Sequence, residues 1–335
     1  MPVTEPRRPK CRGRSTLAPL KQNRDNRLSY IVGILVAALV LVAVLWTLWS
    51  ELQPDRERAV RVQLQDQLQQ TFPQAMLPAP GYYGVFPASA ASGTTRAVDV
   101  VLVHGLDEPG SIWDDLVPAL SKAGFTSWEF RYSNDQGMDR SADLLAASWG
   151  ALPNDRPMVL IGHSMGGLVI RDFVTRWRHA TAVPEVLAGP QVSRVILVGT
   201  PNQGSDWARM RFWLEPRDQL TAIREQRFSM LSGLQDGTGV AKIDLRPGSR
   251  FLENLNTRPW PAEVPLWIIG GLLAPAAPVL GDGVVSVDSL ALEGAAAPIL
   301  VAGSHRGILK RLSESAQEPA AIPLILELLK DSSEP

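Results

Sequence analysis

One uncharged apolar run near the N-terminus constrains this chain more than any other feature. Residues 31–48, IVGILVAALVLVAVLWTL, carry no charge. With Tyr30 and Trp49 the run reaches 20 residues, and a helix of that length is about 30 Å long, the thickness of a bilayer core. Tyr30, Trp46 and Trp49 stand near its ends, where amphipathic rings favour the membrane interface. The run therefore predicts a transmembrane anchor over residues 30–49.

Two other interpretations of this run, a buried core helix and a cleaved signal peptide, fit the sequence less well. A buried core helix is disfavoured because this segment is both apolar all round and close to the N-terminus. A cleaved signal peptide would have a shorter apolar core followed by a small-x-small site, and the sequence continues WSELQPDRERA without one. An uncleaved anchor is therefore expected.

The charges on either side of the anchor predict its orientation. Residues 1–30 hold eight basic and two acidic side chains, a net charge of +6, whereas residues 50–66 have a net charge of −1. The positive-inside rule then makes residues 1–29 a basic cytoplasmic tail and places the rest across the membrane, on the periplasmic face of the inner membrane in a bacterium. Arg7 and Arg8 lack a following hydrophobic signature, so they do not predict an export signal.

Composition excludes several function classes. The net charge of −1 provides no basic field for nucleic acid. The single cysteine, Cys11, cannot form an intrachain disulfide. No cluster of histidines and cysteines has the spacing of a zinc site, and neither a metal nor a cofactor is expected.

Residues 50–96 are expected to form a juxtamembrane helix and a linker. Over residues 55–71 the sequence predicts a polar helix, with Val60, Leu64, Leu68 and Phe72 spaced by four. This helix could be a stalk, could lie on the membrane, or could pack on the body as an arm, which is the interpretation we prefer. Residues 73–96 are rich in Pro, Gly, Ala and Ser and predict a loop.

Residues 97–335 alternate between apolar runs and helical stretches. The strands are expected at 97–103, 126–132, 157–162, 192–199, 264–271 and 298–303. The helices are expected at 111–124, 138–152, 166–180 and 318–331. Continuous apolar strands interleaved with helices predict an α/β fold, with a mostly parallel central sheet flanked by helices on both faces.

The pentapeptide GHSMG at residues 162–166 is the first chemical signal. It is short enough to occur by chance, so its context matters: a predicted strand precedes it and a predicted helix follows. Gly162 and Gly166 give Ser164 room on a sharp strand-to-helix turn. The helix N-terminus there favours negative charge. Ser164 is therefore the candidate nucleophile.

A serine nucleophile needs a base, and the chain has four histidines. His163 adjoins the serine and is expected to point away from it, and His179 lies about four turns along the next helix. His104 precedes the serine at a strand end. His305 follows the last predicted strand, on a loop at the edge where open α/β sheets place their sites. Elimination favours His305 as the base.

A carboxylate must orient that histidine. Between Ser164 and His305 the segment GDGVVSVDS at residues 281–289 offers Asp282 and Asp288. Asp282 lies in a tight glycine-flanked loop soon after a strand, whereas Asp288 is expected in a following extended segment. Asp282 is therefore preferred, with Asp288 as the alternative.

The oxyanion of an acyl-transfer reaction needs N–H donors. One candidate is the backbone N–H of Met165, which follows the nucleophile. The second is the backbone N–H of Leu106, because the sequence VLVHGL ends an earlier strand with a His-Gly turn. His104 is expected to shape that turn.

Residues 97–313 resemble the α/β-hydrolase family, and within it bacterial lipases and esterases. The resemblance rests on VLVHGL, GHSMGG, VGTPNQGS at 198–205, GDGVV and the loop with His305. The family's chain order is nucleophile, acid, base, and the resemblance implies these roles for Ser164, Asp282 and His305. Asn202 and Gln203 depart from the commoner GTPHxGS pattern. The resemblance does not cover residues 1–80 and does not specify a substrate.

The resemblance also implies a cap or lid, expected at about residues 205–260, where apolar side chains alternate with charges in DWARMRFWLEPRDQL. A moving lid and a fixed cap remain equal alternatives. Some related lipases bind a structural calcium, for which Asp288 or Glu293 could serve.

These signals together predict a membrane-anchored serine hydrolase that cleaves carboxylic esters, with an ester or lipid as substrate. Two alternatives stay open. The same triad could transfer the acyl group to an alcohol or thiol, or the chain could be a non-catalytic, membrane-tethered interaction protein with a hydrolase fold.

Overall fold

The structure is a computed structural model and describes residues 20–76, 81–91, 96, 98–106, 110–179, 187–207, 237–274, 276–313 and 317–330. The basic tail, with Arg7, Arg8 and Cys11, lies outside these residues. The chain divides into two compact units, Met1–Pro54 and Asp55–Pro335.

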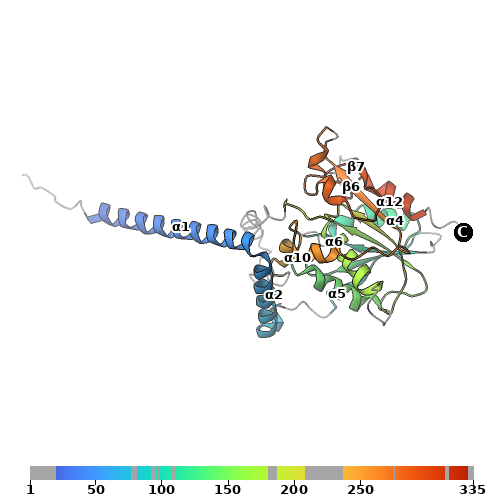
Figure 1. Cartoon of the computed structure of the whole chain (residues 1–335), viewed down its shortest axis with the longest axis horizontal. Coiled ribbons are helices and arrows are strands. Elements are labelled where there is room, and N and C mark those ends of the chain that lie inside the picture. Colours follow the sequence, from blue (N-terminus) through green and yellow to red (C-terminus); the bar gives the residue numbers. More distant parts are fainter. Residues whose placement is uncertain are drawn as a thin grey trace, which may run out of the picture. The chain divides into compact units, whose positions relative to one another are not determined.

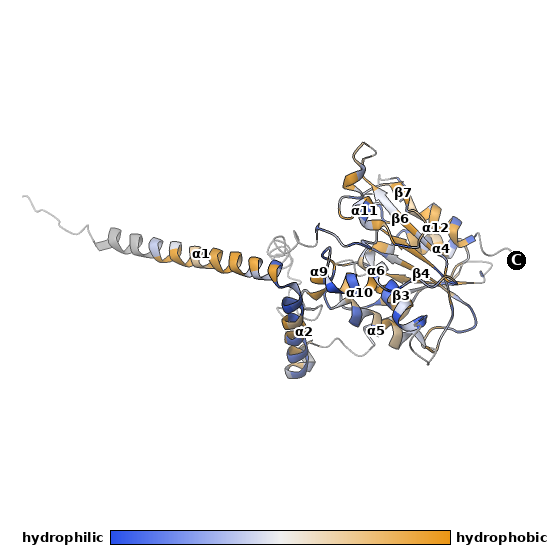
Figure 2. Cartoon of the chain, in the orientation of Figure 1, coloured by the Kyte–Doolittle hydropathy of each residue, from blue (hydrophilic) through white to orange (hydrophobic). Residues whose placement is uncertain are grey.

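The first unit contains one long helix, α1 (Leu20–Leu52). Its segment Ser29–Leu52 is long and apolar enough to cross a membrane. Figure 2 shows this run of apolar residues in orange, with no polar stripe along the helix. A helix that is apolar on every side is suited to lipid or to a protein core, and this one is not buried inside the protein.

The second unit is built on a seven-stranded sheet in the order β1-β3-β2-β4-β5-β6-β7. Figure 1 shows α5 on one side of this sheet and α4 and α12 on the other. All neighbouring strands are parallel except β1 and β3. The strands are β1 (Gly84–Ser89), β2 (Asp99–Val103), β3 (Ser127–Arg131), β4 (Met158–His163), β5 (Val192–Val198), β6 (Leu266–Leu272) and β7 (Ile299–Ala302). The predicted mostly parallel sheet is confirmed.

One strand lies where a loop was expected. Strand β1, together with the short helix α3 (Pro73–Met76), falls within residues 73–96. Its sequence GVFPAS contains a proline, which removes a ladder donor and argues against a strand. β1 pairs only with β3, at the edge of the sheet, and its register shifts between Pro87 and Ser89. An edge position tolerates the missing N–H, so the loop prediction was wrong here.

Helices cover both faces of the sheet. The side chains of β4 alternate: Met158 and Leu160 join the core under α5 (Met138–Trp149) and α6 (Met165–Phe173), whereas Val159 and Ile161 join the core under α4 (Leu116–Lys122) and α12 (Ala321–Lys330). This explains why the strands are apolar throughout rather than alternating.

Some helices are shorter than expected. The expected helix 111–124 consists of a short 3₁₀ turn, η1 (Ser111–Trp113), followed by α4. Helix α6 continues as a π-helical turn, η2 (Val174–Arg178). Pro118 and Pro323 lie in the first turns of α4 and α12, where the missing N–H breaks no helical hydrogen bond.

Helix α2 (Pro54–Thr71) packs on the body of the second unit. Arg58 Nε donates to Asp244 Oδ1 at 2.6 Å, and Asp244 ends the short helix α9 (Val240–Asp244). Glu57 is fully buried and lies 3.4 Å from a guanidinium nitrogen of Arg246. Among the three alternatives for this helix, the packed arm is the one that these contacts support.

Candidate active site

Ser164 sits on the turn between β4 and α6. Its backbone has φ 55° and ψ −127°, and it is the one non-glycine residue with positive φ among the described residues. Such a conformation costs a non-glycine residue of order 1–3 kcal/mol and persists only where the surroundings enforce it. The strain accompanies a sharp reversal that places Ser164 at the N-terminus of α6.

Two glycines allow this turn to pack. A Cβ on Gly166 would overlap the carbonyl oxygens of Val103 and His104, at the end of β2. A Cβ on Gly162 would lie 2.7 Å from the Cα of Gly167. The close approach of α6 to the end of β2 therefore requires glycine at position 166, and its approach to the end of β4 requires glycine at position 162.

Asp282 and His305 form a buried pair. Oδ2 of Asp282 lies 2.7 Å from Nδ1 of His305, and the two residues are 2% and 9% exposed. The other carboxylate oxygen, Oδ1, accepts the backbone N–H groups of Val284 and Val285 at 2.9 and 2.8 Å. Both oxygens of the carboxylate are thus held in place.

The environment keeps Asp282 ionised. Burial raises the pKa of its carboxyl, but the hydrogen bond and charge of His305, with the N–H groups of Val285 and Val284, outweigh burial and lower the pKa below its usual range. An ionised Asp282 holds the proton of His305 on Nδ1, which leaves Nε2 free to accept a proton.

The pair and Ser164 both lie against the end of β5, at the carboxyl edge of the sheet. The N–H of Ser164 donates to the carbonyl of Val198 at 2.9 Å. At the next residue, Gly199, an added Cβ would lie 3.2 Å from Cε1 of His305 and 3.3 Å from Oδ2 of Asp282. The end of β5 therefore touches both the nucleophile turn and the acid–base pair.

His163 contributes a contact that sequence reasoning missed. Its ring is buried, and Nε2 lies 3.0 Å from the carbonyl oxygen of His305. Because a carbonyl only accepts, Nε2 of His163 must carry the proton. The sequence showed only a histidine beside the nucleophile, and no local signal connects it to a loop 142 residues away.

The two expected oxyanion donors lie on adjoining segments. Met165 begins α6, where the first N–H groups have no acceptor within the helix. Leu106 is buried after the His104 turn, and that turn is held by the Tyr132 hydroxyl, which donates to the His104 carbonyl at 2.5 Å. The ring of His104 stacks on Tyr132, with centroids 4.5 Å apart. A cavity of about 330 Å³ beside this turn is lined by Tyr82, His104 and Asn134, among others.

The other candidates lie elsewhere or cannot be placed. His179 pairs with Glu263 at 2.9 Å, away from this edge. Asp288 is exposed and lies in the short helix α11 (Val287–Leu290), not in an extended segment. Within the described part of the chain, no group of three or more His, Cys, Asp or Glu side chains could hold a metal ion.

The expected cap is mostly outside the described residues. Residues 208–236 of the 205–260 segment are not described. The described part of the segment contains α9 and α10 (Arg250–Asn256), the latter capped by Ser249, whose hydroxyl accepts the N–H of Leu252 at 3.3 Å.

Comparisons with known proteins agree on the fold. The sequence profile of the "Alpha/beta hydrolase family" matches residues 100–327. A search of curated protein sequences finds no significant match. A lipase of Bacillus licheniformis, BlEst2 in mature form, is 20% identical with a TM-score of 0.53, covering 75% of this chain and 99% of its own.

Two further solved structures are similar. A metagenomic carboxyl esterase, MGS0156, is 19% identical with a TM-score of 0.51, and the match covers 73% of this chain and 73% of the esterase chain. A type II thioesterase from a yersiniabactin biosynthetic pathway is 17% identical with a TM-score of 0.51, covering 73% of this chain and 96% of its own. At these identities the likeness shows a shared fold.

Proposed function

The chain belongs to the alpha/beta hydrolase family, and on that premise we propose that it is a membrane-anchored serine hydrolase that cleaves carboxylic esters. The observation that carries the proposal is the buried Asp282–His305 pair, which adjoins the strained turn of Ser164 at the end of β5. The lipase and esterase among the similar structures support an ester as the substrate class.

The reaction proceeds through an acyl-enzyme. Ser164 Oγ attacks the ester carbonyl carbon while its proton passes to Nε2 of His305. The N–H groups of Met165 and Leu106 stabilise the oxyanion. When the C–O bond to the leaving group breaks, His305 returns the proton to the departing alcohol. Water, deprotonated by His305, then attacks the acyl-enzyme and releases the carboxylic acid and Ser164.

Asp282 keeps His305 in the required tautomer throughout, with its Nδ1–H bonded to Oδ2. It also stabilises the imidazolium that forms when His305 takes the serine proton. The cavity beside the His104 turn is a place for part of the substrate.

The anchor over residues 30–49 would hold this site at a membrane surface. The segment Ser29–Leu52 meets the length and apolarity of a membrane span. The strongly basic residues before it support a cytoplasmic N-terminus, with the hydrolase domain on the opposite side.

Labelling of the full-length protein with a fluorophosphonate probe tests the proposal. The wild type should be labelled and Ser164→Ala should not, whereas Ser121→Ala, a change of a half-buried serine on α4, should label like the wild type. Absence of labelling in the wild type, or equal labelling of Ser164→Ala, would contradict the proposed nucleophile.

Substrate assays then refine the reaction. A series of p-nitrophenyl esters of rising acyl length should be hydrolysed, and activity confined to short acyl chains would indicate an esterase rather than a lipase. Product analysis with an added alcohol separates hydrolysis from acyl transfer: a free acid as the main product supports hydrolysis, and a new ester as the main product supports an acyltransferase.

A further inference from the structure

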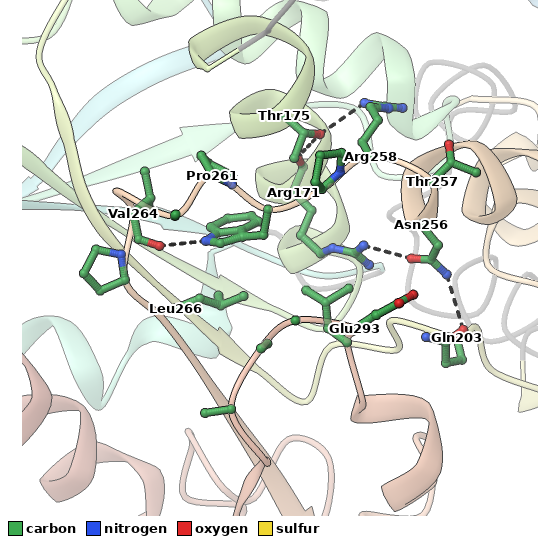
Figure 3. Close-up of a pocket in the computed structure, with 18 residues that line it drawn as sticks. Arg171, Thr175, Gln203, Asn256, Thr257, Arg258, Pro261, Val264, Leu266 and Glu293 are labelled. Carbon is green, nitrogen blue, oxygen red and sulfur yellow. Dashed lines mark hydrogen bonds between the residues drawn. The ribbon is translucent and has the colours of Figure 1, made fainter.

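A second and larger cavity, of about 770 Å³, lies apart from the catalytic edge. Its walls come from the second half of α6, from residues 256–266 before β6, and from residues 292–296 before β7 (Figure 3). None of Ser164, Asp282 and His305 lines it. Its volume is within the range of about 300–1,000 Å³ of small-molecule sites.

Arg171 forms the charged end of this cavity. The residue is 2% exposed, and its guanidinium donates to Oδ1 of Asn202 at 3.1 Å and to Oδ1 of Asn256 at 2.8 Å. Both amides must present oxygen to the guanidinium, because only the oxygen accepts. Figure 3 shows the Arg171–Asn256 hydrogen bond at the cavity wall. Among the described residues no carboxylate forms an ion pair with Arg171.

The acid that follows Arg171 in the sequence, Asp172, is paired with two other arginines. Asp172 accepts from Arg176 at 2.6 Å and from Arg258 at 2.5 Å. Burial, and secondarily the like charge of Arg258, lower the pKa of Arg171 to about 9, against a smaller opposing effect of Asp172. Even so, Arg171 remains a cation at neutral pH. Among the residues that the structure describes, this buried cation is bound by neutral amide oxygens alone. Such burial is costly, and an anion in the cavity would offset that cost.

One wall of the cavity is apolar and is formed by residues 259–262 and 264–266. The indole of Trp260 is fixed by its Nε1–H, which donates to the Val264 carbonyl at 2.7 Å. Pro261 and Leu266 line the same wall (Figure 3). Arg258 also lines the cavity, but it is paired with Asp172. An occupant therefore meets this apolar wall beside a polar wall that holds the guanidinium of Arg171. That combination suits a compact amphiphile rather than a free inorganic ion.

Glu293 limits the charge that the occupant can carry. It lines the cavity from the turn before β7, and Figure 3 shows its carboxylate pointing toward the Arg171–Asn256 end. It lies too far from Arg171 for an ion pair, so it does not neutralise the cation, but it opposes a second negative charge nearby. A monoanion satisfies both side chains better than a dianion.

We propose that this cavity is a binding site for a small organic carboxylate, whose carboxylate contacts the guanidinium of Arg171 and whose hydrocarbon part packs on Trp260. The planar guanidinium matches a carboxylate in geometry. The site is independent of the reaction proposed for Ser164, although α6 carries Arg171 seven residues after the nucleophile, about 10 Å along the helix axis.

Calorimetric titration of the full-length Ser164→Ala protein in nanodiscs tests this site, with empty nanodiscs as the blank. Phenylacetate is the probe, 2-phenylethanol its uncharged analogue and phenyl phosphate a dianionic one. Phenylacetate should bind saturably, and both analogues should bind at least ten-fold more weakly. Absence of saturable phenylacetate binding, or equal binding of the alcohol, overturns the proposal.

Variants then place the binding at this cavity. Arg171→Gln should weaken phenylacetate binding at least ten-fold, whereas Glu293→Gln should tighten it several-fold by removing a repelling charge. Because Glu293 is exposed, its variant stays informative if Arg171→Gln does not fold. Glu253→Gln, an exposed acid on α10 outside the cavity lining, should leave the affinity unchanged. Binding that Glu293→Gln does not tighten overturns the proposal.

Discussion

At the scale of single residues, the two oxygens of Asp282 have separate tasks. Oδ1 is held by the N–H groups of Val284 and Val285, and Oδ2 meets Nδ1 of His305. The first set of bonds positions the carboxylate, and the last selects the tautomer of the histidine. A change of Asp282 can therefore disturb the chemistry while the loop around it stays in place.

We expect Asp282→Asn to lower kcat by about 10⁴-fold with a much smaller change in KM. An amide that keeps its oxygen on the two N–H groups presents NH₂ to Nδ1 of His305. The ring proton then moves to Nε2, which can no longer accept the proton of Ser164. Steady-state hydrolysis of a p-nitrophenyl ester measures this, with Asp288→Asn, an exposed acid on α11, as the control. A comparable loss in the control would shift the role to Asp288.

Gly166 is a second residue on which the site depends. Gly166→Ala should lower the free energy of unfolding by about 3 kcal/mol, because its Cβ overlaps the carbonyl oxygens at the end of β2 and forces backbone apart. Gly150→Ala is the matched control, since its Cβ would meet nothing nearer than 3.8 Å. Chemical denaturation of both variants gives the comparison, and equal stabilities would contradict the close approach.

At the scale of elements, α2 is tied to the body by ion pairs of two kinds. Arg58 pairs with Asp244, whose side chain is 1% exposed, and also lies 2.9 Å from Asp139. Arg140 and Asp66 pair at 2.8 Å with side chains that are 33% and 42% exposed. A buried pair and an exposed pair thus join the same helix to the body, and they should differ in their contribution to stability.

Arg58→Met should lower the free energy of unfolding by about 3 kcal/mol, because it leaves the buried Asp244 without its cation. Arg140→Met removes the exposed pair and should cost less than about 1 kcal/mol. Denaturation of the full-length variants, followed by tryptophan fluorescence, measures the difference. If the two variants unfold alike, α2 is not held by its buried pair.

Asp244 should also make stability depend on pH. Burial raises its pKa from 3.8 to about 6, although the hydrogen bond and charge of Arg58 act in the opposite direction. The folded state then holds this proton more tightly than the unfolded chain, so the contribution to stability falls as pH rises from about 4 to about 6. Asp244→Asn should flatten the pH dependence of the unfolding free energy in that window. An unchanged slope would contradict the raised pKa.

At the scale of the whole molecule, the proposed topology sets the basic tail and the hydrolase domain on opposite sides of a membrane. Cys11 is the single cysteine of the chain and lies in that tail. It therefore serves as a natural reporter of the side on which the tail lies.

In spheroplasts that express the full chain, a membrane-impermeant maleimide should label Cys11 only after the membrane is permeabilised. In a Cys11→Ser background, Lys122→Cys, at the exposed last residue of α4, should label in intact spheroplasts. Labelling of Cys11 in intact spheroplasts would contradict the proposed orientation. Absence of labelling at both positions would place both the tail and the hydrolase domain on the cytoplasmic side.

The sequence by itself determined the features that depend on local pattern. Apolar runs between helical stretches predicted six strands of the sheet, because strands buried on both faces are apolar throughout. The uncharged run predicted the apolar helix. The spacing of Gly162, Ser164 and Gly166 predicted a sharp turn, which the positive φ of Ser164 now describes.

Only the tertiary structure decided the features that arise between distant segments. β1 forms because it can pair with the edge of β3, although Pro87 makes the sequence of β1 a poor strand pattern. His163 meets the His305 carbonyl across 142 residues. Arg171 appeared in sequence as one charge on a helix, and its burial beside a cavity depends on Asn202 and Asn256 from other segments. Periodicity reports which face of an element is buried, but the partner on that face is selected by packing.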